Sequence, residues 1–211
     1  SVFTKPFLDK IIEAERSKEV TTIADSAQLK NALVNATGNT EWIFESKHIT
    51  DVVFAISDHY TWQSTSVEVD KTTGRRTRVD AVFNPVHKDY FNVVTDAQKT
   101  VQYMSERFPK WPFPYEHETV FDGLDQMEYP MMVNDNPLDN RSESIELTDH
   151  EIFHTMFPFY MGINETKYGW MDEGWATIGE WLITNMIDTT LIDEYGMRKI
   201  GRASCRERVS S

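Results

Sequence analysis

The chain has 211 residues, of which 40% are hydrophobic and 12% aromatic, a composition that predicts a packed core and excludes a disordered chain. Its formal net charge is −13, so it carries no general electrostatic signal for binding nucleic acid or an anionic membrane surface. No apolar run reaches the roughly 18–20 residues that a membrane helix needs. The N-terminal residues do not indicate a compartment.

Before residue 84 the sequence predicts short helices followed by strands. The polar stretch 8–33 has spaced apolar positions and predicts one or two short surface helices. Residues 41–54 and 60–69 are rich in Trp, Ile, Phe, Val and Thr, which favours strands. The turn residues Thr72-Thr73-Gly74-Arg75 come next and predict a hairpin whose second strand is 78–83.

The pattern changes after Asn84-Pro85, which we interpret as a domain boundary. Val101, Met104 and Phe108 then follow at helical spacing. The elements expected beyond the boundary are a helix at 95–108, strands at 118–121 and 127–133, and helices at 145–157 and 170–187. This order, strands first and then strands mixed with helices, predicts an α+β fold.

Residues 200–211 do not continue this pattern. Their sequence resembles the translation of a sequencing adapter, and we interpret the segment as an artefact; a natural basic tail is the alternative. The segment contains Cys205, the single cysteine of the chain. The remaining residues therefore offer neither disulfides nor cysteine ligands for a metal.

The strongest chemical signal is the motif His150-Glu151-Ile152-Phe153-His154. Side chains four residues apart lie on one face of a helix, so both imidazoles can reach a single metal ion. Glu151 can then accept a proton from a water molecule on that ion. A catalytic zinc site needs a third protein ligand, and Glu173, separated from His154 by eighteen residues, lies in the next predicted helix.

A helix with two surface histidines and a solvated glutamate is the plainer interpretation of this motif. Glu173 argues against it, because it occurs at a fitting distance in the aromatic-flanked segment 170–176. Asp172 and Glu180 are candidates for orienting a ligand imidazole, although a solvated helix face is the preferred interpretation of Glu180. Metal-ligand spacing is missing at the other histidines, which are His48, His59, His87 and His117.

The HExxH motif followed by glutamate in a W-x-x-E-G-x-A segment resembles the M1 family of zinc aminopeptidases, which are gluzincins. Upstream, Asp125-Gln126-Met127-Glu128-Tyr129-Pro130 resembles the exopeptidase motif of that family. The resemblance implies that residues 1–83 are the C-terminal part of a β-rich N-terminal domain. It implies that residues 84–199 are the first half of a thermolysin-like catalytic domain.

Carried over residue by residue, the resemblance implies one zinc ion bound by His150, His154 and Glu173. It implies that Glu151 is the general base. The implied activity is hydrolysis of N-terminal peptide bonds by zinc-activated water.

The upstream motif bears on the substrate. The resemblance implies that Glu128 holds the free α-amino group of a peptide, and that Gln126 and Met127 line the cleft on the same strand. The implied partners are peptides with a free N-terminus. Within this motif the chain departs from the family pattern in two places, with Asp125 at the usual glycine and Tyr129 at the usual asparagine.

Two other functions stay open at this point. One is a different gluzincin with the same zinc triad, such as a glycyl aminopeptidase or an endopeptidase; Glu128 distinguishes it. The other is a non-catalytic, zinc-containing module that binds peptides, against which Glu151 argues. The transition-state-stabilising tyrosine of the family would fall beyond the last residue, so we expect the chain to be a fragment that is inactive alone.

Overall fold

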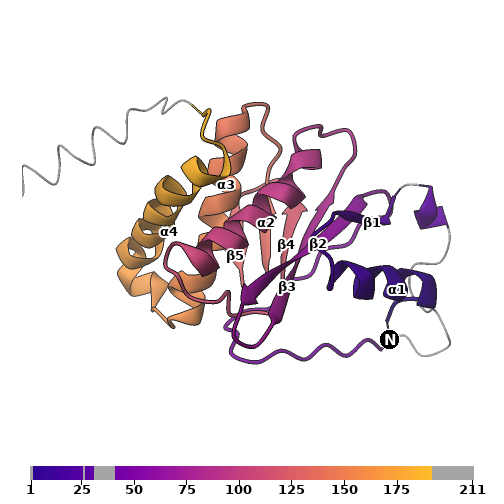
Figure 1. Ribbon diagram of the computed structural model, residues 1–211, viewed down its shortest axis with the longest axis horizontal. Coiled ribbons are helices and arrows are strands. Elements are labelled where there is room, and N and C mark those ends of the chain that lie inside the picture. The colour runs from indigo at the N-terminus through magenta and orange to yellow at the C-terminus, as the bar shows by residue number, and fades with distance from the viewer. Residues whose placement is uncertain (1, 26, 31–40, 192–211) are drawn as a thin grey trace, which may run out of the picture.

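The computed structural model describes residues 2–25, 27–30 and 41–191. They form a mixed six-stranded sheet that is flanked by helices (Figure 1). None of the helices in these ranges has both the length and the apolar character that crossing a membrane requires. The expected artefact at 200–211 lies outside the described residues.

In chain order the elements are α1 (Lys5–Ala14), β1 (Thr21–Ala24), the 3₁₀ turn η1 (Gln28–Lys30), β2 (Thr61–Asp70), β3 (Arg75–Phe83), α2 (Tyr90–Glu106), β4 (His117–Asp122), β5 (Met127–Tyr129), β6 (Met132–Asp135), α3 (Arg141–Phe153), the π-helical turn η2 (Thr155–Tyr160) and α4 (Glu165–Ile187).

The strands are ordered β1-β2-β3-β4-β6-β5 across the sheet. β1, β2 and β3 pair antiparallel, and the predicted hairpin between β2 and β3 is confirmed. β3, β4 and β6 are parallel, and the chain crosses from β3 to β4 through α2. The short strand β5 pairs antiparallel with β6 at the edge of the sheet. These helices and this mixed sheet confirm the predicted α+β class.

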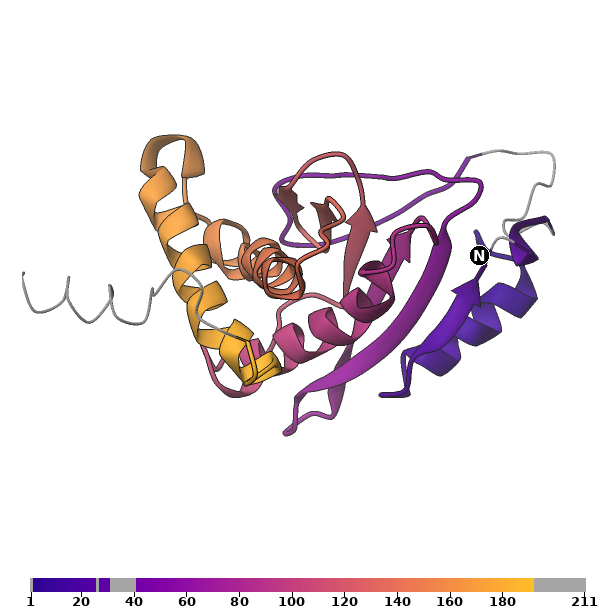
Figure 2. The same cartoon turned by 90° about the horizontal axis from the view of Figure 1, so that it is seen from above.

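Helix α2 packs across the middle of the sheet, on β2, β3 and β4. It buries Val93, Val94, Ala97, Val101 and Met104, which are three or four residues apart and so lie on one face. The helix predicted at 95–108 is confirmed, but it begins earlier, at Tyr90. Its other neighbours are α3 and α4, which lie at the opposite end of the molecule from α1 (Figure 2).

The first correction concerns the stretch 8–33, for which only surface helices were expected. α1 confirms one helix, but residues Thr21–Ala24 form strand β1. Thr21, Thr22 and Ile23 are β-branched residues with a high strand propensity, and they pair with β2. The tertiary contact with β2 therefore decides the conformation of this segment.

The second correction concerns residues 41–54, where a strand was expected. This stretch pairs with none of the described strands. Its side chains at Ile43, Phe44, Val52 and Phe54 are between 77% and 84% exposed. The composition favours a strand, but a strand forms only where a neighbouring one supplies backbone hydrogen bonds.

Residues 127–133 are the third correction, because they form two strands instead of one. Pro130 and Met131 separate β5 from β6, and Met131 takes a positive φ of 68°. Proline has no N–H to donate to the ladder, so it interrupts the strand.

The sheet contains strands from both sides of the expected boundary at Asn84-Pro85, because β3 before it pairs with β4 after it.

The two helices predicted near the C-terminus are present with shifted bounds. α3 begins at Arg141, where the Asn140 side chain accepts hydrogen bonds from the backbone N–H groups of Ser142 and Glu143. It ends at Phe153, before the turn η2 that contains Pro158. α4 begins at Glu165, five residues before the predicted start.

Helices α3 and α4 approach each other closely at Gly179. A Cβ atom added at this glycine would lie 2.2 Å from Cδ2 of the buried Phe153 ring. Real Cβ atoms do not approach another atom so closely, so either the ring or the helix would have to move. Gly179 therefore sets how near α4 can come to α3.

We expect Gly179→Ala to lower the free energy of unfolding by about 1–3 kcal/mol, the usual cost of overpacking a core. The matched control is Gly174→Ala in the same helix, where the added Cβ meets no atom within 4 Å. The control should leave stability unchanged or raise it by up to about 1 kcal/mol, because alanine favours a helix. Urea unfolding followed by circular dichroism measures both, and equal effects would contradict the prediction.

Candidate metal centre

Helix α3 brings together the three residues of the HExxH motif. His150 and Glu151 lie in its last turn, and His154 caps its C-terminal end. Glu151 is 6% exposed and His154 only 1%, so both are held by their surroundings. The imidazole ring centroids of His150 and His154 are 5.0 Å apart. The predicted helical spacing therefore places both rings on one side of α3.

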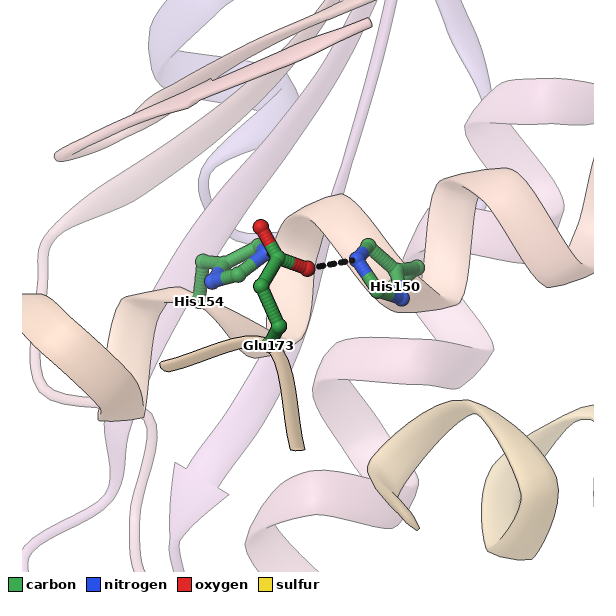
Figure 3. A group of neighbouring side chains, drawn as sticks. All are labelled: His150, His154 and Glu173. Atoms are coloured by element: carbon green, nitrogen blue, oxygen red, sulfur yellow. Dashed lines mark hydrogen bonds and ion pairs between the residues drawn. The ribbon is translucent and has the colours of Figure 1, made fainter. Parts of the chain in front are cut away.

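Helix α4 supplies the third predicted ligand. The Glu173 oxygen Oε2 lies 3.2 Å from Nε2 of His150 and 3.9 Å from Nε2 of His154. Figure 3 shows the Glu173 carboxylate reaching toward both imidazoles of the facing helix. One ligand atom from each of the three residues lies within 4.8 Å of the others. Glu173 itself is 63% exposed, which leaves this side of the group open to solvent.

The second nitrogen of each imidazole contacts a carboxylate on α4. Nδ1 of His154 lies 2.6 Å from Oδ1 of Asp172, and Nδ1 of His150 lies 3.1 Å from Oε2 of Glu180. A carboxylate accepts, so an Nδ1–H of each imidazole donates to it, and Nε2 is the nitrogen that faces Glu173. This orientation is the one that a metal ligand needs.

Glu180 differs from the preferred interpretation of its sequence context. It was expected on a solvated helix face, but its side chain is only 15% exposed and touches His150. The signal was present in the spacing, because Glu180 lies seven residues after Glu173 and hence two helical turns along the same face.

A second group of ligand atoms overlaps the first. Glu128 of strand β5, Glu151 and His154 also have ligand atoms within 4.8 Å of one another. Edge strand β5 contacts α3, which accounts for this approach. The structure thus brings the predicted general base and the predicted substrate anchor beside the histidines.

Gln126 and Met127 are the two residues before Glu128, and both are exposed. Gln126 lies in the turn before β5, where its backbone N–H donates to Asp125 Oδ1 over 3.0 Å. Met127 is the first residue of β5.

The pKa values of Glu151 and His154 are both raised. Burial raises the pKa of Glu151 to about 7, against the opposing effect of the two histidines. Burial by itself lowers the pKa of His154, but the hydrogen bond to Asp172 and the nearby carboxylates outweigh it and raise the pKa to about 9. A bound cation would compensate the carboxylates that produce this second shift.

Two further carboxylates, those of Asp135 and Glu118, are buried beside α3, and the sequence does not indicate their burial. Thr148 donates to Asp135 over 3.1 Å, and Thr155 donates to Glu118 over 3.5 Å. Burial raises the pKa of Asp135 to about 8 and that of Glu118 well above its usual value. Burial depends on long-range packing, so a pattern of single residues could not have indicated these groups.

The remaining histidines lie away from the group. Nδ1 of His87 contacts Asp122 over 2.6 Å, and Nδ1 of His59 contacts Asp58 over 2.7 Å. The clusters of candidate metal ligands in the described residues include none of His48, His59, His87 and His117.

A comparison of the chain with protein-family models and with curated proteins finds no match.

We expect Asp172→Ala to weaken zinc binding by about 10–100-fold, because the His154 imidazole loses the acceptor that orients it. The dissociation constant is measured by competition with a chromophoric chelator. Asp9→Ala is the control, since it removes the same charge from an exposed position on α1. Equal affinities of the Asp172 variant and the control would contradict the orienting role.

Proposed function

We propose that the chain carries the zinc centre of an aminopeptidase that hydrolyses N-terminal peptide bonds and that resembles the M1 family. The observation that supports this most is the convergence of His150, His154 and Glu173, whose ligand atoms lie within 4.8 Å of one another. Two imidazoles and one carboxylate are a common donor set for catalytic zinc.

The chemistry of the donors supports zinc as the ion. Both histidines hold hydrogen on Nδ1 through Asp172 and Glu180, so their Nε2 atoms are available as ligands. The set contains three protein ligands, and the exposed side of Glu173 leaves room for a fourth, external one. When bound, zinc supplies Lewis acidity, which polarises a carbonyl and lowers the pKa of water to about 7.

Glu151 is the proton carrier in this proposal. It is buried beside the histidines, next to the position where the ion and its water would lie, so it can take a proton and give it back. It would take a proton from the attacking water and deliver it to the nitrogen of the leaving amine. The new bond joins the water oxygen to the peptide carbon, and the C–N bond breaks.

Glu128 and β5 would position the substrate. β5 is the last strand in the sheet order, so its outer edge is available for an extended peptide to pair with. The Glu128 carboxylate lies near Glu151 and His154 and can pair with an ammonium group. An internal segment of a longer chain has no ammonium group there, so this contact favours peptide ends.

We expect one zinc ion per chain by native mass spectrometry, lost in His154→Ala and retained in Glu151→Gln. The first variant removes a ligand atom, whereas the second keeps the shape of the site and removes only the base. In the intact protein, Glu151→Gln should lose hydrolysis of aminoacyl substrates.

Three results would contradict the proposal. A folded, unmutated chain without zinc would overturn the metal centre. Full activity of Glu151→Gln would exclude its role as a base. An intact protein that binds zinc but turns over no aminoacyl substrate would indicate a peptide-binding module.

We expect Glu128→Ala in the intact protein to lower kcat/KM for peptides with a free N-terminus by about 10–1000-fold, because a charge-assisted contact is lost. Glu68→Ala, an exposed glutamate on β2, is the control and should change nothing. Equal turnover of N-acetylated and free peptides by the unmutated enzyme would indicate an endopeptidase instead.

A further inference from the structure

A buried carboxyl group joins three helices next to the candidate metal centre without contributing to it. Asp149 is fully buried on α3. Its Oδ2 lies 2.8 Å from Oγ1 of Thr184 on α4, and its Oδ1 contacts Oγ1 of Thr100 on α2. Asp149 belongs to neither cluster of candidate metal ligands.

We propose that Asp149 is a positioning residue for the metal centre. Through Thr184 it holds α4 at the register along α3 that brings Glu173 to the two histidines. This inference rests on the proposed zinc site, because its consequence is the affinity of that site for the ion.

The register between the two helices is visible in three polar contacts. His154 meets Asp172, His150 meets Glu180, and Asp149 meets Thr184. The residue numbers fall on α3 as they rise on α4, so the helices run antiparallel along this row. The first two contacts involve the metal ligands themselves. The contact of Asp149 is therefore the one in this row that can hold the register independently of the ligands.

Apolar packing alone does not define this register. The contact of Phe153 with Gly179 sets the distance between the helices, but an aromatic ring over a glycine has little directional preference. A buried hydrogen bond is directional, and sliding α4 along α3 would leave Oδ2 of Asp149 without the Thr184 hydroxyl, although Oδ1 would keep Thr100. An unpaired buried oxygen is unfavourable, which penalises other registers.

The neighbouring contacts show how α3 itself is held. Arg141, the first residue of α3, pairs with Asp96 of α2 over 2.7 Å. Thr100 of α2 contacts Asp149 in the last turns of α3. α3 is thus tied to α2 near both ends, and Thr184 adds α4 to this frame. Metal–ligand distances tolerate only about 0.2 Å, so a small slip of α4 would displace Glu173 from the ion.

The test compares two buried threonines that each donate one hydrogen bond to a buried carboxylate. Thr184→Val removes the bond from α4 to Asp149, whereas Thr148→Val removes the bond from α3 to Asp135 on β6. Both changes keep the volume and lose one bond. We expect the zinc dissociation constant to rise at least tenfold in Thr184→Val and less than twofold in Thr148→Val.

Three further measurements separate positioning from general destabilisation. The thermal midpoints of the metal-free variants should fall by similar amounts. The visible spectrum of the cobalt-substituted chain should change in Thr184→Val and not in Thr148→Val, because it reports ligand geometry. Asp149→Asn, which keeps the shape of the carboxyl group and one acceptor oxygen, should bind zinc more tightly than Asp149→Ala.

The outcomes distinguish this inference from the proposed function. No zinc on the unmutated, folded chain would overturn both. Zinc on the unmutated chain, with equal affinity in Thr184→Val, would overturn the positioning role alone. An equal loss of affinity in both threonine variants would also overturn it, because general destabilisation would then explain the result. If Thr184→Val does not fold, equal affinity of Asp149→Asn and Asp149→Ala decides against it.

Discussion

The packing of α4 against α3 is the contact on which the candidate metal centre depends. α3 carries both histidines and Glu151, whereas Glu173, Asp172 and Glu180 come from α4. Gly179 allows the close approach because it has no side chain to meet the Phe153 ring. Since every contact between ligand and orienting carboxylate crosses this interface, the distance and register of the two helices determine whether the donors converge.

Electrostatics explain why such an arrangement favours a cation. The imidazoles lie among the carboxylates of Asp172, Glu173, Glu180, Glu151 and Glu128, several of which are partly or fully withdrawn from water. Burying carboxylates is costly unless positive charge or hydrogen bonds compensate them. His154 provides part of this compensation, as its raised pKa indicates. A divalent ion between the ligands would supply more, and it would displace that proton.

The sheet positions Glu128 of β5 beside the candidate metal centre. The parallel strands β3, β4 and β6 lie in the order that puts β5 at the edge, next to α3. The chain reverses at Pro130 and Met131, so that β5 pairs with β6 and Glu128 lies near Glu151 and His154. The candidate metal ligands and the edge strand β5 therefore occur together.

The local parts of this protein follow from the order of its residues alone. The spacing of His150 and His154 predicts one helical face, and α3 has it, because helical periodicity is a property of the backbone. The α+β class, the β2–β3 hairpin and the approach of Glu173 to both histidines were predicted in the same way. Tertiary structure decided what depends on distant partners. Residues 21–24 became a strand because β2 lies beside them, while residues 41–54 have strand composition but no described partner. The contacts of Glu180 with His150 and of Asp149 with Thr184 likewise exist only because α3 and α4 pack together. The sequence of one helix does not indicate which residues of the other helix its side chains will contact.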